Sequence, residues 1–294
     1  MIKLKTFGSF TVGNDITSVQ EGAWRSEKLE KLFVYLAMNR NRGVCIEDIS
    51  EAIWQVEEET DNPVGALKNL AYRLRKALRD ASFDEECIVS VRGGLYKWND
   101  DVEVTIDAEE FDRYINEAEL AFSRSKETAI ESYEKAIALY HGDFLPLRTD
   151  THWFMTLNAF YHSRYVNTVK ALAKLYIDTG CYEKLEQLCT KAIVYERCDE
   201  QIYSYLIMAR MRTKKVQMAF DTYETAKAIM DNDLGVRKTV MLNKVYEELL
   251  SVTKGVSSYN IDEVKEDINE ESMDGVFMCG YPVFKEIYHL EVRK

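Results

Sequence analysis

The chain has 294 residues, of which 46% are hydrophobic and 12% aromatic, so it is long and apolar enough for two folded domains and is not intrinsically disordered. Its 38 Lys and Arg stand against 50 Asp and Glu, and the net charge of -12 excludes indiscriminate binding to nucleic acid. No apolar run is long enough to span a bilayer, and six scattered cysteines indicate reduced thiols. We therefore expect a cytoplasmic protein without membrane contact or a secretion signal.

The first hundred residues predict short strands followed by three helices and a hairpin. Alternating apolar residues indicate strands over 2–16, and residues 26–39 form an amphipathic helix that begins at Ser26. A shorter helix covers 46–54 and a third covers 64–80. Two β-rich runs over 88–98 flank a glycine-containing tip, which indicates a hairpin. This order is that of a winged helix-turn-helix, in which the third helix enters the major groove of DNA.

The third helix is unusual in an acidic chain because it holds five basic residues and no acid between positions 64 and 79. An ordinary solvated helix face would mix both signs of charge to gain support between residues four apart. Arg73 and Asn69 are predicted to read base edges, because Arg pairs with guanine and Asn with adenine. The predicted phosphate contacts are Lys68, Tyr72, Lys76 and Arg79 on this helix, Lys97 on the wing, and Arg25 and Lys28 at the first helix. Arg92, at the tip of the wing, is expected near the minor groove. Arg75 is instead expected to form a salt bridge inside the domain, to Glu47 or Glu51.

Residues 107–252 change to a helical period with an internal repeat of 34 residues. Leu185, Cys189 and Ala192 recur as Ala219, Tyr223 and Ala226, which is the spacing of tetratricopeptide repeats. A degenerate first unit is predicted over 108–140, and residues 141–154 are an insertion before a long helix. Within this domain Trp153, Tyr161 and Tyr165 could line a ligand site, although core packing is the preferred interpretation.

Nine segments in one order resemble the SARP/AfsR-type bacterial transcription activators, in which an OmpR-like winged helix precedes a bacterial transcriptional activation domain built of tetratricopeptide repeats. They are LKTFGSFTV, RSEKLEKLFVYLA, ISEAIW, NLAYRLRKAL, VRGGLYKW, TIDAEEFDRY, AIALYHGDFL, GCYEKLEQLCTKAI and AFDTYETAKAIMDNDLGV. The resemblance implies an activator that binds direct repeats in promoters and then contacts RNA polymerase. Two departures, Arg197-Cys198 in place of a proline and Lys214 in place of a glycine, predict weaker turns in the repeats.

The predicted fold is therefore mainly α: a winged-helix DNA-binding domain over 1–105 and a repeat domain over 106–252. A linker is expected over 253–271 and a tail over 272–294 that could begin a further module. The expected partners are double-stranded DNA, RNA polymerase and a second copy on DNA, and the repeats could hold an unknown ligand or protein. The alternative is an interaction scaffold in which both domains bind protein. Catalytic motifs are missing, so no enzyme, cofactor or metal site is expected.

Overall fold

The computed structural model describes residues 1–14, 16–54, 62–83, 87–91, 94–233, 235 and 239–256, with side chains described except at 89–91 and 252–256. Residues 1–246 form one compact unit, and residues 247–294 form a second, of which only the end of one helix is described. Within the described residues, no helix combines the length and apolar character that crossing a bilayer requires.

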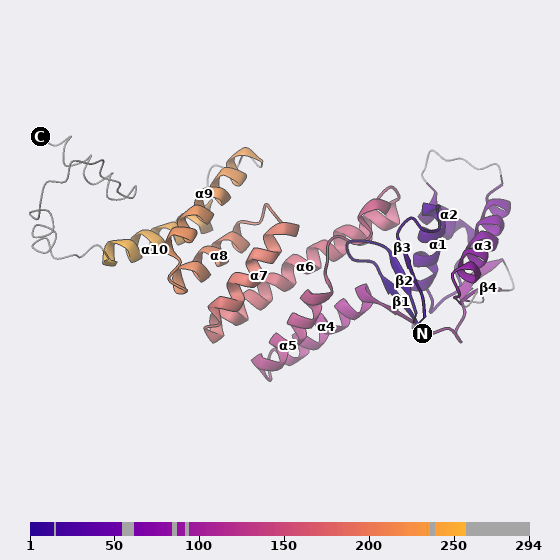
Figure 1. Ribbon diagram of the computed structural model, residues 1–294, viewed down its shortest axis with the longest axis horizontal. Coiled ribbons are helices and arrows are strands. Elements are labelled where there is room, and N and C mark those ends of the chain that lie inside the picture. Colours follow the sequence, from indigo (N-terminus) through magenta and orange to yellow (C-terminus); the bar gives the residue numbers. More distant parts are fainter. Residues whose placement is uncertain are drawn as a thin grey trace, which may run out of the picture. The chain divides into compact units, whose positions relative to one another are not determined.

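The N-terminal part is a winged helix, as the sequence predicts (Figure 1). Strands β1 (Ile2–Lys5), β2 (Thr11–Gly13) and β3 (Ser18–Gln20) form an antiparallel sheet. Helices α1 (Glu27–Met38), α2 (Ile46–Ile53) and α3 (Pro63–Asp80) follow. The hairpin of β4 (Ile88–Val91) and β5 (Leu95–Trp98) completes the domain. The predicted cap Ser26 does occupy the position before α1, but its side chain makes no capping hydrogen bond.

A strand that the sequence reading missed closes the sheet. Strand β6 (Val104–Ile106) pairs with β1 in parallel, giving the strand order β3-β2-β1-β6. Its three residues lie between the hairpin and the first repeat helix, at the predicted domain boundary. The chain therefore returns to the N-terminal sheet before it starts the repeats.

The repeats consist of helices that follow one another along the chain, and each of the first five packs on the next. They are α4 (Asp107–Ala121), α5 (Lys126–Leu139), α6 (His152–Thr179), α7 (Tyr182–Tyr195), α8 (Glu200–Arg212), α9 (Val216–Asn232) and α10 (Val240–Val256). Helix α7 begins 34 residues before α9, and the repeated positions of both helices are buried. The 34-residue period is thus a structural repeat. Helix α10 continues through Val256, so the predicted linker begins inside a helix, and its remainder and the tail lie outside the described residues.

Lys214 occupies the turn where the repeat pattern calls for glycine. Its backbone φ is +62°, close to the +72° of Gly180 at the equivalent position one repeat earlier. The predicted weakening of the turn therefore does not change its conformation, because Lys214 adopts the left-handed geometry that favours glycine. For a residue with a Cβ atom this conformation costs roughly 1–2 kcal/mol.

The insertion joins the repeats to the winged helix. It ends at Thr151 rather than at the predicted residue 154, because α6 begins at His152. The amide of Gly8 donates to the carbonyl of Asp143 at 2.9 Å, and the amide of Leu145 donates to the carbonyl of Thr6 at 2.8 Å. Gly8 has a φ of +81°, and a Cβ atom there would lie 2.6 Å from the His141 carbonyl oxygen. Only glycine allows this close approach of the two backbones.

Buried polar contacts continue this junction onto helices α1 and α2. Glu30 and Arg148 are buried and form a salt bridge, in which Arg148 Nε lies 3.1 Å from a Glu30 carboxylate oxygen. The buried Lys31 pairs with Asp150, and the Thr151 hydroxyl donates to the Ala52 carbonyl at 2.8 Å. Breaking one partner of a buried pair costs about 3–5 kcal/mol, so these contacts tie the insertion to the helix-turn-helix.

Asp107, the first residue of α4, has a buried carboxylate that binds the other side of the junction. It accepts hydrogen bonds from the Thr6 amide at 2.8 Å, the Thr6 hydroxyl at 2.6 Å, the Phe7 amide at 3.2 Å and the Ala108 amide at 2.9 Å. Burial raises the pKa of Asp107, and the hydrogen bonds from Thr6, Phe7 and Ala108 oppose that rise. The ring of Phe7 then packs among Phe111, Tyr140 and Tyr161 of the repeats.

Replacing Asp107 with Asn should lower the free energy of unfolding by about 2–4 kcal/mol, because an amide NH₂ would face N–H donors that are left unsatisfied in the core. Urea denaturation followed by circular dichroism measures this. The matched control is the exposed Asp101→Asn, which should change stability by less than about 0.5 kcal/mol. Equal stability of both variants would contradict the role given to Asp107.

Replacing Lys214 with Gly should raise the free energy of unfolding by about 0.5–1 kcal/mol, because glycine removes the strain of the positive φ at some cost in chain entropy. The reciprocal change Gly180→Ala should destabilise the protein. Thermal unfolding of the two variants and the parent tests the pair, and a loss of stability on Lys214→Gly would show that the turn is not strained.

Candidate nucleic-acid interface

Helix α3 is positioned by its N-terminal cap and by one apolar stripe. The Asn62 side chain accepts a hydrogen bond from the Gly65 amide at 2.9 Å. Pro63 lies in the first turn, where a backbone N–H would have no partner inside the helix, so the N–H that proline lacks is not missed. The stripe packs into the domain core and consists of Leu67, Leu70, Ala71, Leu74 and Leu78. Because these residues recur every three to four positions, the opposite side of the helix must face solvent.

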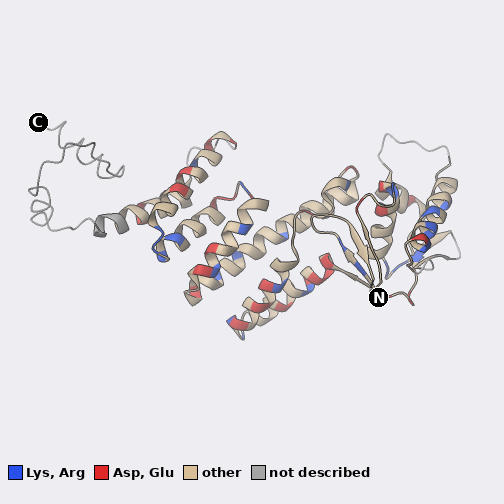
Figure 2. Cartoon of the chain, in the orientation of Figure 1, with Lys and Arg blue, Asp and Glu red and all other residues tan. Residues whose placement is uncertain are grey.

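The opposite side carries every α3 residue that the sequence predicts to contact DNA, and all of them are exposed. This recognition face consists of Lys68, Asn69, Tyr72, Arg73, Lys76 and Arg79. Tyr72 is 67% exposed, although it is a large aromatic residue. Within the described part of the chain, no carboxylate forms a salt bridge with Lys68, Arg73 or Lys76. The basic residues follow the length of α3 in Figure 2.

Arg75 lies beside this face, but its side chain forms hydrogen bonds within the domain. Its guanidinium donates to the carbonyl of Ile88 from Nε at 3.2 Å and from Nη2 at 3.0 Å. The expected salt bridge to Glu47 or Glu51 is therefore replaced by a contact to a backbone carbonyl. Sequence reasoning missed this acceptor because a carbonyl carries no residue signature. The contact links α3 directly to the first strand of the wing.

The wing is also fastened to the segment before α2. Val44 and Tyr96 exchange backbone hydrogen bonds of 2.7 and 2.9 Å, so the residues between α1 and α2 add a third extended segment to the hairpin. Lys97 of the wing forms a salt bridge with Asp100 at 2.5 Å. To contact a phosphate, Lys97 would have to leave this carboxylate. Arg92 lies outside the described residues.

The two basic residues at the first helix differ in their surroundings. Arg25 is exposed and has a positive φ of +51°. Lys28 is half-buried, with its ammonium 5.9 Å from the centre of the Trp54 ring. Trp54 therefore packs beside Lys28, whereas Trp98 is buried in the core, where its ring lies 5.4 Å from that of Phe33.

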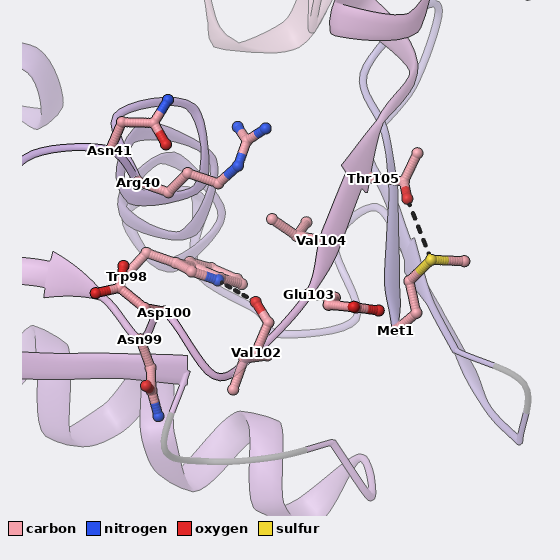
Figure 3. Close-up of a pocket in the computed structure, with 10 residues that line it drawn as sticks. All are labelled: Met1, Arg40, Asn41, Trp98, Asn99, Asp100, Val102, Glu103, Val104 and Thr105. Carbon is pink, nitrogen blue, oxygen red and sulfur yellow. Dashed lines mark hydrogen bonds between the residues drawn. The ribbon is translucent and has the colours of Figure 1, made fainter.

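A cleft of about 390 Å³ lies between the end of the wing and β6 (Figure 3). The indole N–H of Trp98 donates to the Val102 carbonyl at 2.7 Å and forms part of the wall. Arg40 and Glu103 bring opposite charges to the lining, and Arg40 is already bound to Glu109. With both charges present and the cation engaged, this cleft offers no clear preference for a ligand.

The aromatic residues considered for a ligand site in the repeats form part of the core. Tyr161 and Tyr165 are buried, and burial raises the pKa of both phenols. Trp153 is half-buried and lies against Tyr35 of α1, with ring centres 4.8 Å apart. These side chains therefore serve packing. The described side chains also contain no group of three or more His, Cys, Asp and Glu suited to a metal ion.

Comparison with known proteins finds the same two parts in the same order. Residues 21–98 match the family described as "Transcriptional regulatory protein, C terminal". Residues 106–250 match the family described as "Bacterial transcriptional activator domain".

Two relatives extend the comparison to most of the chain. The chain is 23% identical to the transcriptional regulator RedD of Streptomyces coelicolor over 238 residues, which cover 80% of this chain and 67% of RedD. The solved structure of EmbR from Mycobacterium tuberculosis, in complex with a low affinity phosphopeptide, superposes with a TM-score of 0.64 at 19% identity. That match covers 93% of this chain and 72% of EmbR and shows a shared fold. The two family matches, the similarity to RedD and the shared fold together show that the chain belongs to the SARP/AfsR-type family of bacterial transcription regulators.

Proposed function

We propose that this transcription regulator is an activator that binds tandem promoter repeats as a dimer, with α3 in the major groove and the 88–98 wing beside it, and that it contacts RNA polymerase through its repeats. The observation that carries the proposal is the recognition face of α3, which is exposed and basic and holds no acid from residue 64 to residue 79, in a chain of net charge -12. A basic helix surface of this kind attracts phosphates, although the chain as a whole repels them.

The residues of this face take two roles in the proposal. Arg73 and Asn69 lie on the exposed side of the helix and have the fork and amide geometries that read guanine and adenine. Lys68, Tyr72, Lys76 and Arg79 contact phosphates and set the register of the helix on the duplex. Arg25, Lys28 and Lys97 add contacts to the flanking backbone, and Arg92 contacts the minor groove from the tip of the wing.

Arg75 supports this arrangement from within the domain. Because its guanidinium holds the Ile88 carbonyl, the wing is attached to the same helix that enters the groove. A shift of α3 on the duplex would then move the wing with it. The acidic repeats keep affinity for nonspecific DNA low, since their field repels phosphate at distances shorter than the screening length.

Replacing Arg73 with Ala should weaken binding to the operator by about 1–3 kcal/mol and relax the preference for one base pair, because a bidentate contact to a base edge is lost. Footprinting on DNA upstream of neighbouring genes locates the operator. Gel shifts with the operator and a scrambled duplex then measure both effects. Lys174→Ala, a change of an exposed basic residue on α6, is the control and should bind as the parent does. Equal retardation of both duplexes by parent and Arg73→Ala would contradict direct readout.

A duplex with two tandem half-sites should bind at least about tenfold more tightly than one with a single half-site, because the second head binds at a high effective concentration. The affinity for both duplexes should fall with salt, with a log-log slope of about 0.9 for each phosphate contact. Fluorescence anisotropy at several salt concentrations measures both quantities. Equal affinity for one and two half-sites would contradict binding as a dimer.

A further inference from the structure

His162 of α6 lies between two carboxylates, one at each nitrogen of its ring. Its Nδ1 is 2.9 Å from Oδ1 of Asp143 in the insertion, and its Nε2 is 3.0 Å from Oε2 of Glu196, which follows α7. The ring therefore connects three segments of the chain: α6, the insertion and the turn between α7 and α8. We call His162, Asp143 and Glu196 the His162 cluster.

Further hydrogen bonds hold both carboxylates in place. The Tyr140 hydroxyl at the end of α5 donates to the same Asp143 oxygen at 2.8 Å, and it lies 3.5 Å from His162 Nδ1. Burial raises the pKa of Tyr140, so its phenol remains a donor at neutral pH. The Cys198 amide donates to the second oxygen of Glu196 at 2.9 Å. Both carboxylates are thus fixed beside the ring.

Asp143 is also the residue at which the insertion meets the winged helix. Its carbonyl accepts a hydrogen bond from the Gly8 amide at 2.9 Å, while its carboxylate faces His162. A Cβ atom on the neighbouring Gly142 would lie 3.1 Å from Gly8 Cα and 3.8 Å from the ring of Tyr195 on α7. The insertion therefore touches the winged helix and the end of α7 at one point, and the contact that holds the Asp143 side chain also holds the backbone that binds Gly8.

The arrangement of the His162 cluster requires a charged ring. A neutral imidazole has one N–H donor and one acceptor, whereas an imidazolium donates from both nitrogens. Between two carboxylates, the neutral ring would present a lone pair either to Asp143 or to Glu196, and that hydrogen bond would be lost. The charged ring instead forms two charge-assisted hydrogen bonds.

The surroundings of the ring favour its charged form. Burial lowers the pKa of His162, but the hydrogen bonds and charges of Glu196 and Asp143 outweigh burial and raise the pKa above the ordinary value of 6.5. The titratable groups that face the ring are these two carboxylates, from the α7–α8 turn and the insertion, and the Tyr140 phenol from α5. A histidine with a raised pKa stabilises the fold below its unfolded pKa, and this contribution is lost as the pH rises through the folded value.

We propose that protonation of His162 controls how firmly the insertion is attached to the repeats and, through Asp143, to the winged helix. With a charged ring, the insertion is bound to the turn between α7 and α8. When the ring loses its proton, one carboxylate is released and the contact between Asp143 and Gly8 is weakened. The junction is then firmer in mildly acidic than in alkaline solution. DNA takes no part in these contacts, so the inference does not depend on the proposed function.

The test uses NMR and hydrogen exchange on the full chain. The histidine signal that disappears in His162→Gln identifies the ring, and its titration gives the midpoint. Hydrogen exchange, corrected for the intrinsic rate, gives the protection of the Gly8 and Leu145 amides at about pH 6 and about pH 9, on either side of the titration. Glutamine is polar but carries no charge. The matched control is His152→Gln, a change of an exposed histidine on the same helix, and Glu196→Gln removes one carboxylate without altering the ring.

We expect His162 to titrate with a midpoint above 6.5 in the parent, and Glu196→Gln to lower that midpoint. In the parent and in His152→Gln, the protection of both amides should fall by at least about threefold from the lower to the higher pH, whereas in His162→Gln it should change by less than about 1.5-fold.

A parent midpoint at or below 6.5 would overturn the proposal, and so would an equal pH dependence of protection in the parent and in His162→Gln. If His162→Gln does not fold, the titrations of the parent and of Glu196→Gln decide the matter. A ring with a merely structural role would keep its midpoint when Glu196 loses its charge, and that result would also overturn the proposal.

Discussion

The buried carboxylate of Asp107 is the interaction on which the arrangement of this chain depends. It lies where β6 ends and the first repeat helix begins, and it accepts hydrogen bonds from Thr6 and Phe7 at the end of β1. The Asp107 carboxylate accepts hydrogen bonds both from the amides that follow β1 and from the Ala108 amide at the start of α4. Strand β6 can therefore pair with β1 while α4 starts directly after it. The aromatic ring of Phe7 is then directed into the repeats, where it packs beside Phe111 and Tyr161.

The charged residues of the junction are paired with counterions, whereas several basic residues of α3 are not, within the described part of the chain. At the junction, Glu30 and Lys31 are neighbours on α1 and are both buried, and each finds a counterion in the insertion, where Arg148 also pairs with Glu21 and Glu27. On α3 the opposite holds, since the described residues supply no counterions for Lys68, Arg73 and Lys76. The helix that is proposed to meet phosphate thus carries basic residues and no acid over positions 64–79.

The elements with strong periodicity could be predicted from the sequence. The stripe of Leu67, Leu70, Leu74 and Leu78 predicts both the buried side of α3 and the exposed recognition face, and the 34-residue recurrence predicts α6–α9. Strand β6 was missed because three residues give too short an alternation and its pairing partner is a hundred residues away in sequence. The partners of Arg75 and Glu30 were missed for a related reason: a backbone carbonyl has no sequence signature, and Arg148 lies in an insertion without periodicity.

The strand β6 has a practical consequence for anyone who wants the DNA-binding part alone. A chain cut after the wing hairpin would lose the strand that covers one edge of β1, and it would leave Phe7, Glu30 and Lys31 in water without the groups that bury them. Exposed strand edges and apolar rings promote self-association. Expression of this domain in isolation therefore calls for a boundary beyond the insertion rather than at the end of the hairpin.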